Sequence, residues 1–336
     1  MKNLSKANKL IEDIAKKDKR ITPITPKDLP LFQKFFKKEP HTYGNSWTYV
    51  TQGMYGIGPH GLGYKYYDGK NLSAVAIYPK IEQPDIHCFY WVRPMGQGIL
   101  DVIDIYAKNL LKIQSIPTYV KKIFKNQFDY LCKKGFKDTS KFPWHTSCPS
   151  EDDTYSEQIY EVKKTLLLLS SPPRTSNIRK SYRKSMHIEK DKKIIITDNS
   201  FEEVARKVTK DFFNSEYIKN KKVNVSDEND YYNPIFANKK NNALIKKFFY
   251  INNIPLAYFI GERQKKDYTS IYVLISLRDR IQYLSDYVYF KLLEISQTKY
   301  LNLGGSEDEG IHKFKKKFKP VRSNKMYWAT YHNFSR

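Results

Sequence analysis

Cysteine and histidine are scarce in this sequence, and neither residue type is grouped. The three cysteines, Cys88, Cys132 and Cys148, include no closely spaced pair of the kind that binds a metal, and their odd number argues against a disulfide framework. No two of the seven histidines are spaced i, i+4, as two ligands on one helix face would be. We therefore expect inert thiols in a reducing compartment and no metal site.

Long apolar runs are also missing. The longest aliphatic run, residues 166–169, is far shorter than the roughly 20 residues that cross a bilayer. The first ten residues lack the apolar core of a signal peptide. The sequence also contains no P-loop and no Ser/His/Asp motif. These absences predict a soluble, cytoplasmic protein.

Acidic residues are outnumbered, with 35 Asp and Glu against 59 Lys and Arg, which gives a net charge of +24. Such a charge favours an anionic partner: tRNA, another nucleic acid, an anionic membrane surface or a phosphorylated ligand. The alternative is the codon usage of an AT-rich genome, which also enriches Lys, Asn, Ile and Tyr. The 336 residues suggest about two domains.

The predicted elements occur twice in the same order. Residues 88–92 (CFYWV) and 271–276 (IYVLIS) each predict a buried strand, and 182 residues separate Phe89 from Ile271. Each strand follows a turn between two apolar runs, at Asp68-Gly69 and at Asn252-Asn253, and precedes an apolar helix, at residues 99–111 and 281–295. Short strands (119–123 and 300–303) and the segments KKGFK and KKKFK close the two series. This period exceeds the roughly 20–50 residues of solenoid repeats, so we interpret it as duplication of a whole α/β domain.

Turn-forming residues and changes in composition along the sequence suggest four segments. We expect a loosely attached basic helix at residues 1–20, an N-terminal domain at 21–170, a linker at 171–175 and a C-terminal domain at 176–336. The linker contains Ser-Pro-Pro-Arg, and residues 164–169 predict a strand that closes the first domain. A strongly basic helix, residues 177–186, opens the second.

A glycine-rich loop lies between a buried strand and a helix of the first half. Its candidate cofactor-binding residues are Arg93, Met95, Gly96, Gln97 and Gly98. Glycines let backbone approach a ligand closely, and the unpaired N–H groups of a helix start attract a pyrophosphate. The alternative is a glycine-rich turn without a ligand.

The first half contains the segments ITPITPKDLPLFQKFF, RPMGQG and LCKKGF in this order. They are similar to the first strand and helix, the acyl-CoA pyrophosphate loop and the penultimate helix of the GNAT acyltransferases, which the first half therefore resembles. Many members carry a Tyr four residues before the last Gly as a general acid, where this sequence has Leu131, with Tyr130 beside it. The resemblance implies acyl-CoA as donor and a cleft between splayed central strands.

Near its end the second half contains the segment GIHKFKKKFKP, a Gly followed by a helix and an F-K-x-x-F pattern. With this pattern the second half resembles the Fem-type peptidyltransferases and the catalytic domain of phosphatidylglycerol lysyltransferase, which are tandem GNAT folds, although Lys319 stands where Gly is usual. The resemblance implies that Phe314 lies at the donor site and that Lys315 stabilises charge in acyl transfer. It also points to Arg179 and Arg183 on the basic helix as anion-binding residues. The alternative is a solvated helix face whose apolar residues are core contacts.

In the second half, the loop LRDR occupies the position of the pyrophosphate loop but contains no glycine. Arg278 and Arg280 are candidates to bind an anion through their guanidinium groups. A charged turn without a ligand is the alternative.

Together these features predict an α/β (α+β) chain of two tandem GNAT-type domains, each with a mixed, mainly antiparallel sheet flanked by helices. The expected activity is transfer of an acyl or aminoacyl group to an amine-bearing acceptor. The donor is acyl-CoA if the glycine loop binds it, or aminoacyl-tRNA if the second half does. The sequence names no general base and no oligomeric state. A non-catalytic scaffold that binds RNA or an anionic surface stays open.

Overall fold

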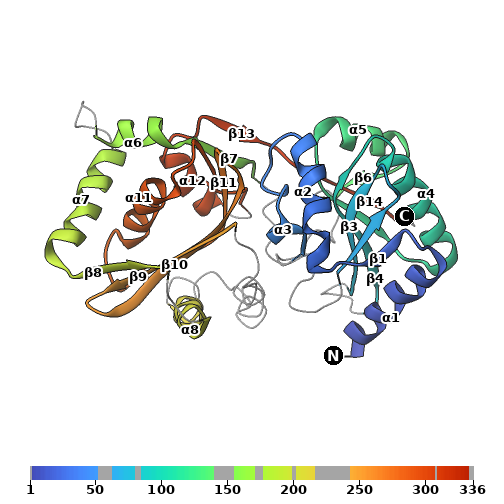
Figure 1. Cartoon of the computed structure of the whole chain (residues 1–336), viewed down its shortest axis with the longest axis horizontal. Coiled ribbons are helices and arrows are strands. Elements are labelled where there is room, and N and C mark those ends of the chain that lie inside the picture. The colour runs from blue at the N-terminus through green and yellow to red at the C-terminus, as the bar shows by residue number, and fades with distance from the viewer. Residues whose placement is uncertain are drawn as a thin grey trace. The chain divides into compact units, whose positions relative to one another are not determined.

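The computed structural model describes residues 2–51, 63–79, 85–139, 155–170, 177–198, 202–215, 243–306 and 309–332 (Figure 1). The chain divides into two compact units. Unit 1 comprises Met1–Ser156, Gly305–Asp308 and Asn324–Arg336, and unit 2 comprises Glu157–Gly304 and Glu309–Ser323. Among the described helices, none combines the length and the apolar character needed to cross a membrane.

Unit 1 is built on a mixed sheet of seven strands. Its strands are β1 (Ile21–Pro23), β2 (Tyr64–Tyr67), β3 (Leu72–Pro79), β4 (His87–Met95), β5 (Thr118–Ile123), β6 (Lys137–Asp138) and β14 (Tyr327–Tyr331), in the order β1-β2-β3-β4-β5-β14-β6. Its helices are α1 (Lys2–Lys17), the 3₁₀ turn η1 (Pro26–Asp28), α2 (Leu29–Lys38), α3 (Trp47–Thr51), α4 (Ile99–Gln114) and α5 (Lys125–Lys133). Only β4 and β5 pair in parallel among the strand pairs described for this sheet.

Helix α1 belongs to the core of unit 1. Its Ala7, Ile11 and Ile14 follow the i, i+4, i+7 spacing of one helix face, and all three are buried against the sheet together with Ile99 and Ile103 of α4. The expectation of a loosely attached helix was therefore wrong, because its lysines cover only the outer face.

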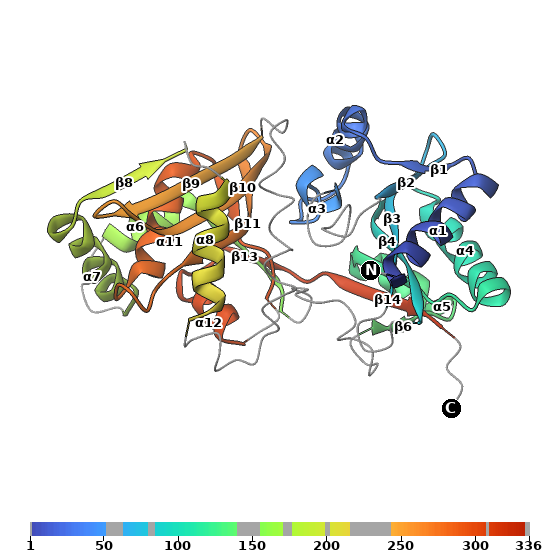
Figure 2. The same cartoon turned by 90° about the horizontal axis from the view of Figure 1, so that it is seen from below.

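Unit 2 repeats this architecture. Its strands are β7 (Glu157–Glu161), β8 (Ile194–Thr197), β9 (Leu244–Ile251), β10 (Ile254–Lys265), β11 (Tyr268–Ser276), β12 (Tyr300–Asn302) and β13 (Arg322–Asn324), in the order β13-β7-β12-β11-β10-β9-β8. Its helices are α6 (Val162–Ser170), α7 (Asn177–Asp191), α8 (Glu202–Phe213), α11 (Leu284–Ser296) and α12 (Glu309–Lys317). Helix α8 lies on one side of the sheet and α11 on the other, and α7 packs outside α11 (Figures 1 and 2).

The two sheets confirm the duplication. Each runs through a series of antiparallel strands to one parallel pair, β4–β5 in unit 1 and β11–β12 in unit 2, and ends with two further strands. An apolar helix follows the first strand of each parallel pair, as the sequence predicts.

The two halves of the sequence exchange one strand each, which moves the boundary between the units away from the predicted one. Strand β7 pairs with β12 in unit 2, while β14, from near the C-terminus, pairs with β5 and β6 in unit 1. The compact units therefore separate after Ser156 rather than at the expected linker, residues 171–175, which lies outside the described residues.

Residues 164–169 are helical, so the predicted closing strand was wrong. They belong to α6, in which Val162, Leu166 and Leu169 follow i, i+4, i+7 spacing and face the core of unit 2. A run of four leucines has no period of its own, so this segment of the sequence does not distinguish a buried strand from a helix.

Candidate functional site

The glycine loop of unit 1 is packed against its own β2–β3 hairpin. Gly96 has a φ of +111°, and a Cβ added there would lie 2.5 Å from Asn71 Oδ1 and 2.6 Å from the backbone oxygen of Lys70. Both distances are far below van der Waals contact. The glycine thus permits close approach, as the sequence suggests, but the approaching group belongs to the protein itself.

Asn71 also occupies the start of α4. Its Oδ1 accepts a hydrogen bond from the Gly98 amide at 3.0 Å, and its Nδ2 donates to Asp68 Oδ2 at 2.9 Å. Asp68 Oδ1 accepts the backbone amides of Lys70 and Asn71. One of the amides that would meet a pyrophosphate is therefore already bonded inside the unit.

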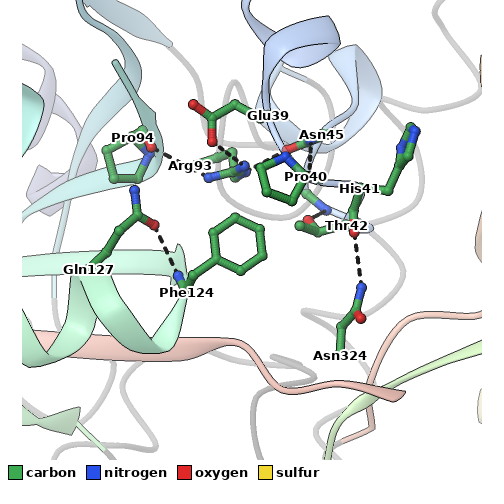
Figure 3. Close-up of polar contacts among 11 residues, drawn as sticks. Glu39, Pro40, His41, Thr42, Asn45, Arg93, Pro94, Phe124, Gln127 and Asn324 are labelled. Atoms are coloured by element: carbon green, nitrogen blue, oxygen red, sulfur yellow. Dashed lines mark hydrogen bonds and ion pairs between the residues drawn. The ribbon is translucent and has the colours of Figure 1, made fainter. Parts of the chain in front are cut away.

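The Arg93 side chain lies in the interior and joins two segments (Figure 3). It is fully buried, with Nε donating to Asn45 Oδ1 at 2.5 Å and Nη2 at 3.1 Å from Glu39 Oε2. The guanidinium also lies 5.0 Å from the centre of the Phe124 ring. Arg93 thus holds residues 39–45 against β4, while Met95 is buried and Gln97 is exposed.

Sequence reasoning missed two lysines beside Arg93. Lys121 and Lys122 are fully buried on β5, where the parallel pairing with β4 ends at Val92 and Lys121. Both strands bulge there, because Arg93 and Lys122 have φ values of 51° and 57°. In sequence, KKIFK is indistinguishable from a solvated basic segment.

Aromatic rings surround both buried lysines. Lys121 Nζ lies 4.2 Å from the ring centre of Trp328 and 5.2 Å from that of Tyr90. Lys122 Nζ lies 5.7 Å from the ring centre of Tyr43 and 5.6 Å from that of Tyr49. Cation–π attraction at such distances offsets part of the cost of burying an ammonium group.

The corresponding loop of unit 2 opens onto a cavity of about 310 Å³. Its lining residues are Asp211, Phe212, Asn214, Ser215, Ser276, Leu277, Arg278, Asp279 and Arg280. The amides of Arg278 and Arg280 donate to the loop's own carbonyls, at Ser276 and Leu277. Any anion in this cavity would therefore meet the exposed arginine side chains rather than these backbone amides.

The α12 signature is anchored through its backbone and its rings. Tyr160 donates from its hydroxyl to the Lys315 carbonyl at 2.8 Å, and burial raises the pKa of Tyr160 well above its ordinary value. Phe314 packs against Phe318, with ring centres 5.2 Å apart, and Phe318 is fully buried. Phe314 is thus partly a core residue, and Lys315 is half-buried.

Lys317, which the sequence did not single out, joins three helices. Its Nζ lies 2.6 Å from Asp286 Oδ1 on α11 and 2.9 Å from Ser181 Oγ on α7. Ser181 donates to the other oxygen of Asp286. This contact fixes α12, and with it Lys315, against the rest of unit 2.

Arg179 and Arg183 lie apart from the cavity. Arg179 Nε donates to the Leu168 carbonyl at 2.8 Å, at the C-terminal end of α6, and Arg183 is exposed on α7. Neither these two residues nor Phe314 and Lys315 line the cavity that contains Arg278 and Arg280.

Within the described ranges, no three His, Cys, Asp or Glu side chains gather as a metal site requires. Cys88 is buried and Cys132 half-buried, neither in a disulfide, and burial raises the pKa of the Cys132 thiol. Cys148 lies outside the described residues.

No known family model and no curated protein matches this chain. Several solved structures match it. L-PGS from Bacillus licheniformis is 13% identical, with a TM-score of 0.56 over 93% of each chain. FemX is 14% identical, with a TM-score of 0.54 over 93% of this chain and 97% of that one.

A third similar structure is a tandem GNAT protein from the clavulanic acid biosynthesis pathway. It is 7% identical, with a TM-score of 0.54 over 93% of this chain and 98% of that one. At these identities the likeness concerns the fold. The chain thus has a tandem GNAT-like fold that resembles FemX and L-PGS.

Proposed function

We propose that this protein transfers an aminoacyl group from aminoacyl-tRNA to an amine-bearing acceptor, and that unit 2 holds the donor. One contrast between the units carries the proposal. In unit 1, Asn71 occupies the loop between strand and helix, whereas the equivalent loop of unit 2 lines a cavity with Arg278 and Arg280.

The chemistry of the loop favours a phosphate-rich donor. A guanidinium group presents paired N–H donors that fit phosphate oxygens, and it keeps its charge at any physiological pH. The net charge of +24 suits a polyanion as large as tRNA better than it suits a single CoA. FemX and L-PGS share the fold, which makes an aminoacyl donor compatible with this architecture.

The transfer itself needs three conditions. The acceptor amine must be neutral, the carbonyl oxygen must meet a positive or N–H group, and the reactants must be held together. Lys315 is our candidate for the second condition. Its helix is held by the Tyr160 and Lys317 contacts, which limits the motion of the ammonium group.

Unit 1 then serves the acceptor rather than the donor. Where the β4–β5 pairing ends, the interior of unit 1 is filled by the buried side chains of Arg93, Lys121 and Lys122 together with aromatic rings. The same filling favours the second candidate, a non-catalytic scaffold that binds RNA or an anionic surface.

A transfer assay separates these possibilities. The full chain is incubated with bulk tRNA charged with ¹⁴C-amino acids and a mixed pool of amines, and the label that survives alkaline hydrolysis as an amide is counted. We expect base-stable product that requires Arg278 and Arg280 but not Arg263, an exposed arginine of β10 that serves as control. Transfer from ¹⁴C-acetyl-CoA alone would replace tRNA by acyl-CoA as donor, and transfer from neither would favour the scaffold.

A further inference from the structure

Helix α6 presents two leucines to solvent. Leu167 is 63% exposed and Leu168 37% exposed, whereas their neighbour Leu169 is buried in the core of unit 2. Single exposed apolar residues are common on protein surfaces and by themselves do not indicate an interaction site. These two leucines are adjacent on one short helix, and basic side chains lie on either side of them.

Cations flank both leucines. Lys163 and Lys164 are exposed on the same helix, which contains no acidic residue. The bond from Arg179 to the Leu168 carbonyl brings the start of α7 beside the end of α6, and Lys180 and Arg183 are exposed there. We name Lys163, Lys164, Leu167, Leu168, Lys180 and Arg183 the α6–α7 patch.

Neither α6 nor the first part of α7 contains an acidic residue. The α7 sequence from Asn177 to His187 contains four Lys or Arg residues and no Asp or Glu, and its acids, Glu189 and Asp191, come in the last turns. Glu189 is paired with Lys291 at 2.6 Å. Helix α7 packs on α11 and forms the outer layer of unit 2 (Figure 1).

We propose that the α6–α7 patch docks unit 2 on the surface of an anionic lipid bilayer. Leucines flanked by lysines and arginines match the two attractions that act at such a surface: burial of apolar area among the acyl chains and pairing of cations with anionic headgroups. RNA would use the cations but would leave the leucines exposed. A second copy of the chain would bring like charges together. The inference is independent of the proposed transfer activity.

The test is sedimentation of the full chain with large vesicles of phosphatidylcholine, with and without phosphatidylglycerol. We expect binding to vesicles that contain phosphatidylglycerol, weakened by salt. Leu167→Ser/Leu168→Ser should weaken partitioning more than tenfold. Lys180→Gln and Arg183→Gln should each weaken it about fivefold, since a cation near such a surface contributes about 1 kcal/mol.

The matched control is Ile105→Ser/Ile113→Ser on α4 of unit 1, which removes two isoleucines that are 58% and 74% exposed. This variant should bind as the unaltered chain does. All substituted residues are surface positions, and circular dichroism checks the fold of each variant. Equal binding by the leucine variant, loss of binding in the isoleucine variant, or self-association that the leucine substitutions abolish would each overturn the proposal.

Discussion

Asn71 Oδ1 lies 3.0 Å from the amide nitrogen of Gly98, so a side chain of the β2–β3 hairpin caps the helix start where the sequence pattern predicts a pyrophosphate. The glycines of this loop make room for that hairpin. The pattern R-x-x-G-x-G reports close approach of another group, but it does not specify which group approaches.

Replacing Gly96 tests the hairpin contact. Gly96→Ala combines a positive φ with overlap against backbone, and it should lower the free energy of unfolding by about 3 kcal/mol or more. Gly69→Ala is the control, because Gly69 has a φ of +91° but nothing within 4 Å of an added Cβ. That variant should lose only about 1 kcal/mol, from strain. Equal losses in urea unfolding would show that the packing against Asn71 is unimportant.

Arg93 should matter for stability rather than for donor binding. Arg93→Met leaves Glu39 and Asn45 without their buried partner, which should cost about 3 kcal/mol. The exposed Arg263 is the control, and Arg263→Met should change stability by less than about 0.5 kcal/mol. If Arg93→Met kept its melting temperature and instead lost affinity for tRNA, Arg93 would be a ligand contact.

The lowered pKa of Asp68 leads us to expect a specific dependence of stability on pH. Burial acts to raise the pKa of Asp68, but hydrogen bonds from the Asn71 side chain, from the Lys70 and Asn71 amides and from Tyr66 outweigh it and lower the pKa. A lowered folded-state pKa contributes stability that is present above the unfolded pKa and is lost as pH falls through the folded pKa. Asp68→Asn should therefore reduce the melting temperature at pH 7, and the difference from the unaltered chain should shrink towards pH 3. A difference that is constant with pH would exclude this linkage.

Because β14 lies within the sheet of unit 1, we expect unit 1 to need this strand for stable folding. A chain that ends at Ser323 lacks β14, including Trp328 and Ala329, which are buried between β5 and β6. Loss of one buried Trp alone costs roughly 3–5 kcal/mol, comparable to the stability of a small domain. We expect unit 1 to lose its cooperative thermal transition, whereas a chain ending at His332 should keep it. Calorimetry that showed two intact transitions in the shorter chain would contradict the pairing.

Local patterns predicted the repeated elements well. Strand β11, helix α11 and the Asn252-Asn253 turn follow from alternation, helical spacing and turn chemistry, which act within a few residues. The pairing of strands that are distant in sequence could not be predicted from these local patterns. Nothing near Tyr327 or Glu157 in sequence indicates that β14 completes the sheet of unit 1 and that β7 completes the sheet of unit 2.

The candidate site shows the same division. The LRDR loop was placed correctly between a strand and a helix, but its cavity depends on residues of α8, far away in sequence. The burial of Lys121 and Lys122 depends on two bulges and on aromatic rings from three distant segments. Asn71 looked like an ordinary turn residue, because a capping contact across 27 positions leaves no local signal.

Hydrogen exchange of the full chain, with and without an aminoacylated minihelix of the tRNA acceptor stem, tests most directly which unit holds the donor. We expect slower exchange in peptides that cover Ser276–Arg280 and no change in those that cover Met95–Gly98, with the protection lost in Arg278→Gln/Arg280→Gln and kept in Arg263→Gln. Protection of Met95–Gly98 with unchanged exchange at Ser276–Arg280 would contradict it and return the donor to unit 1.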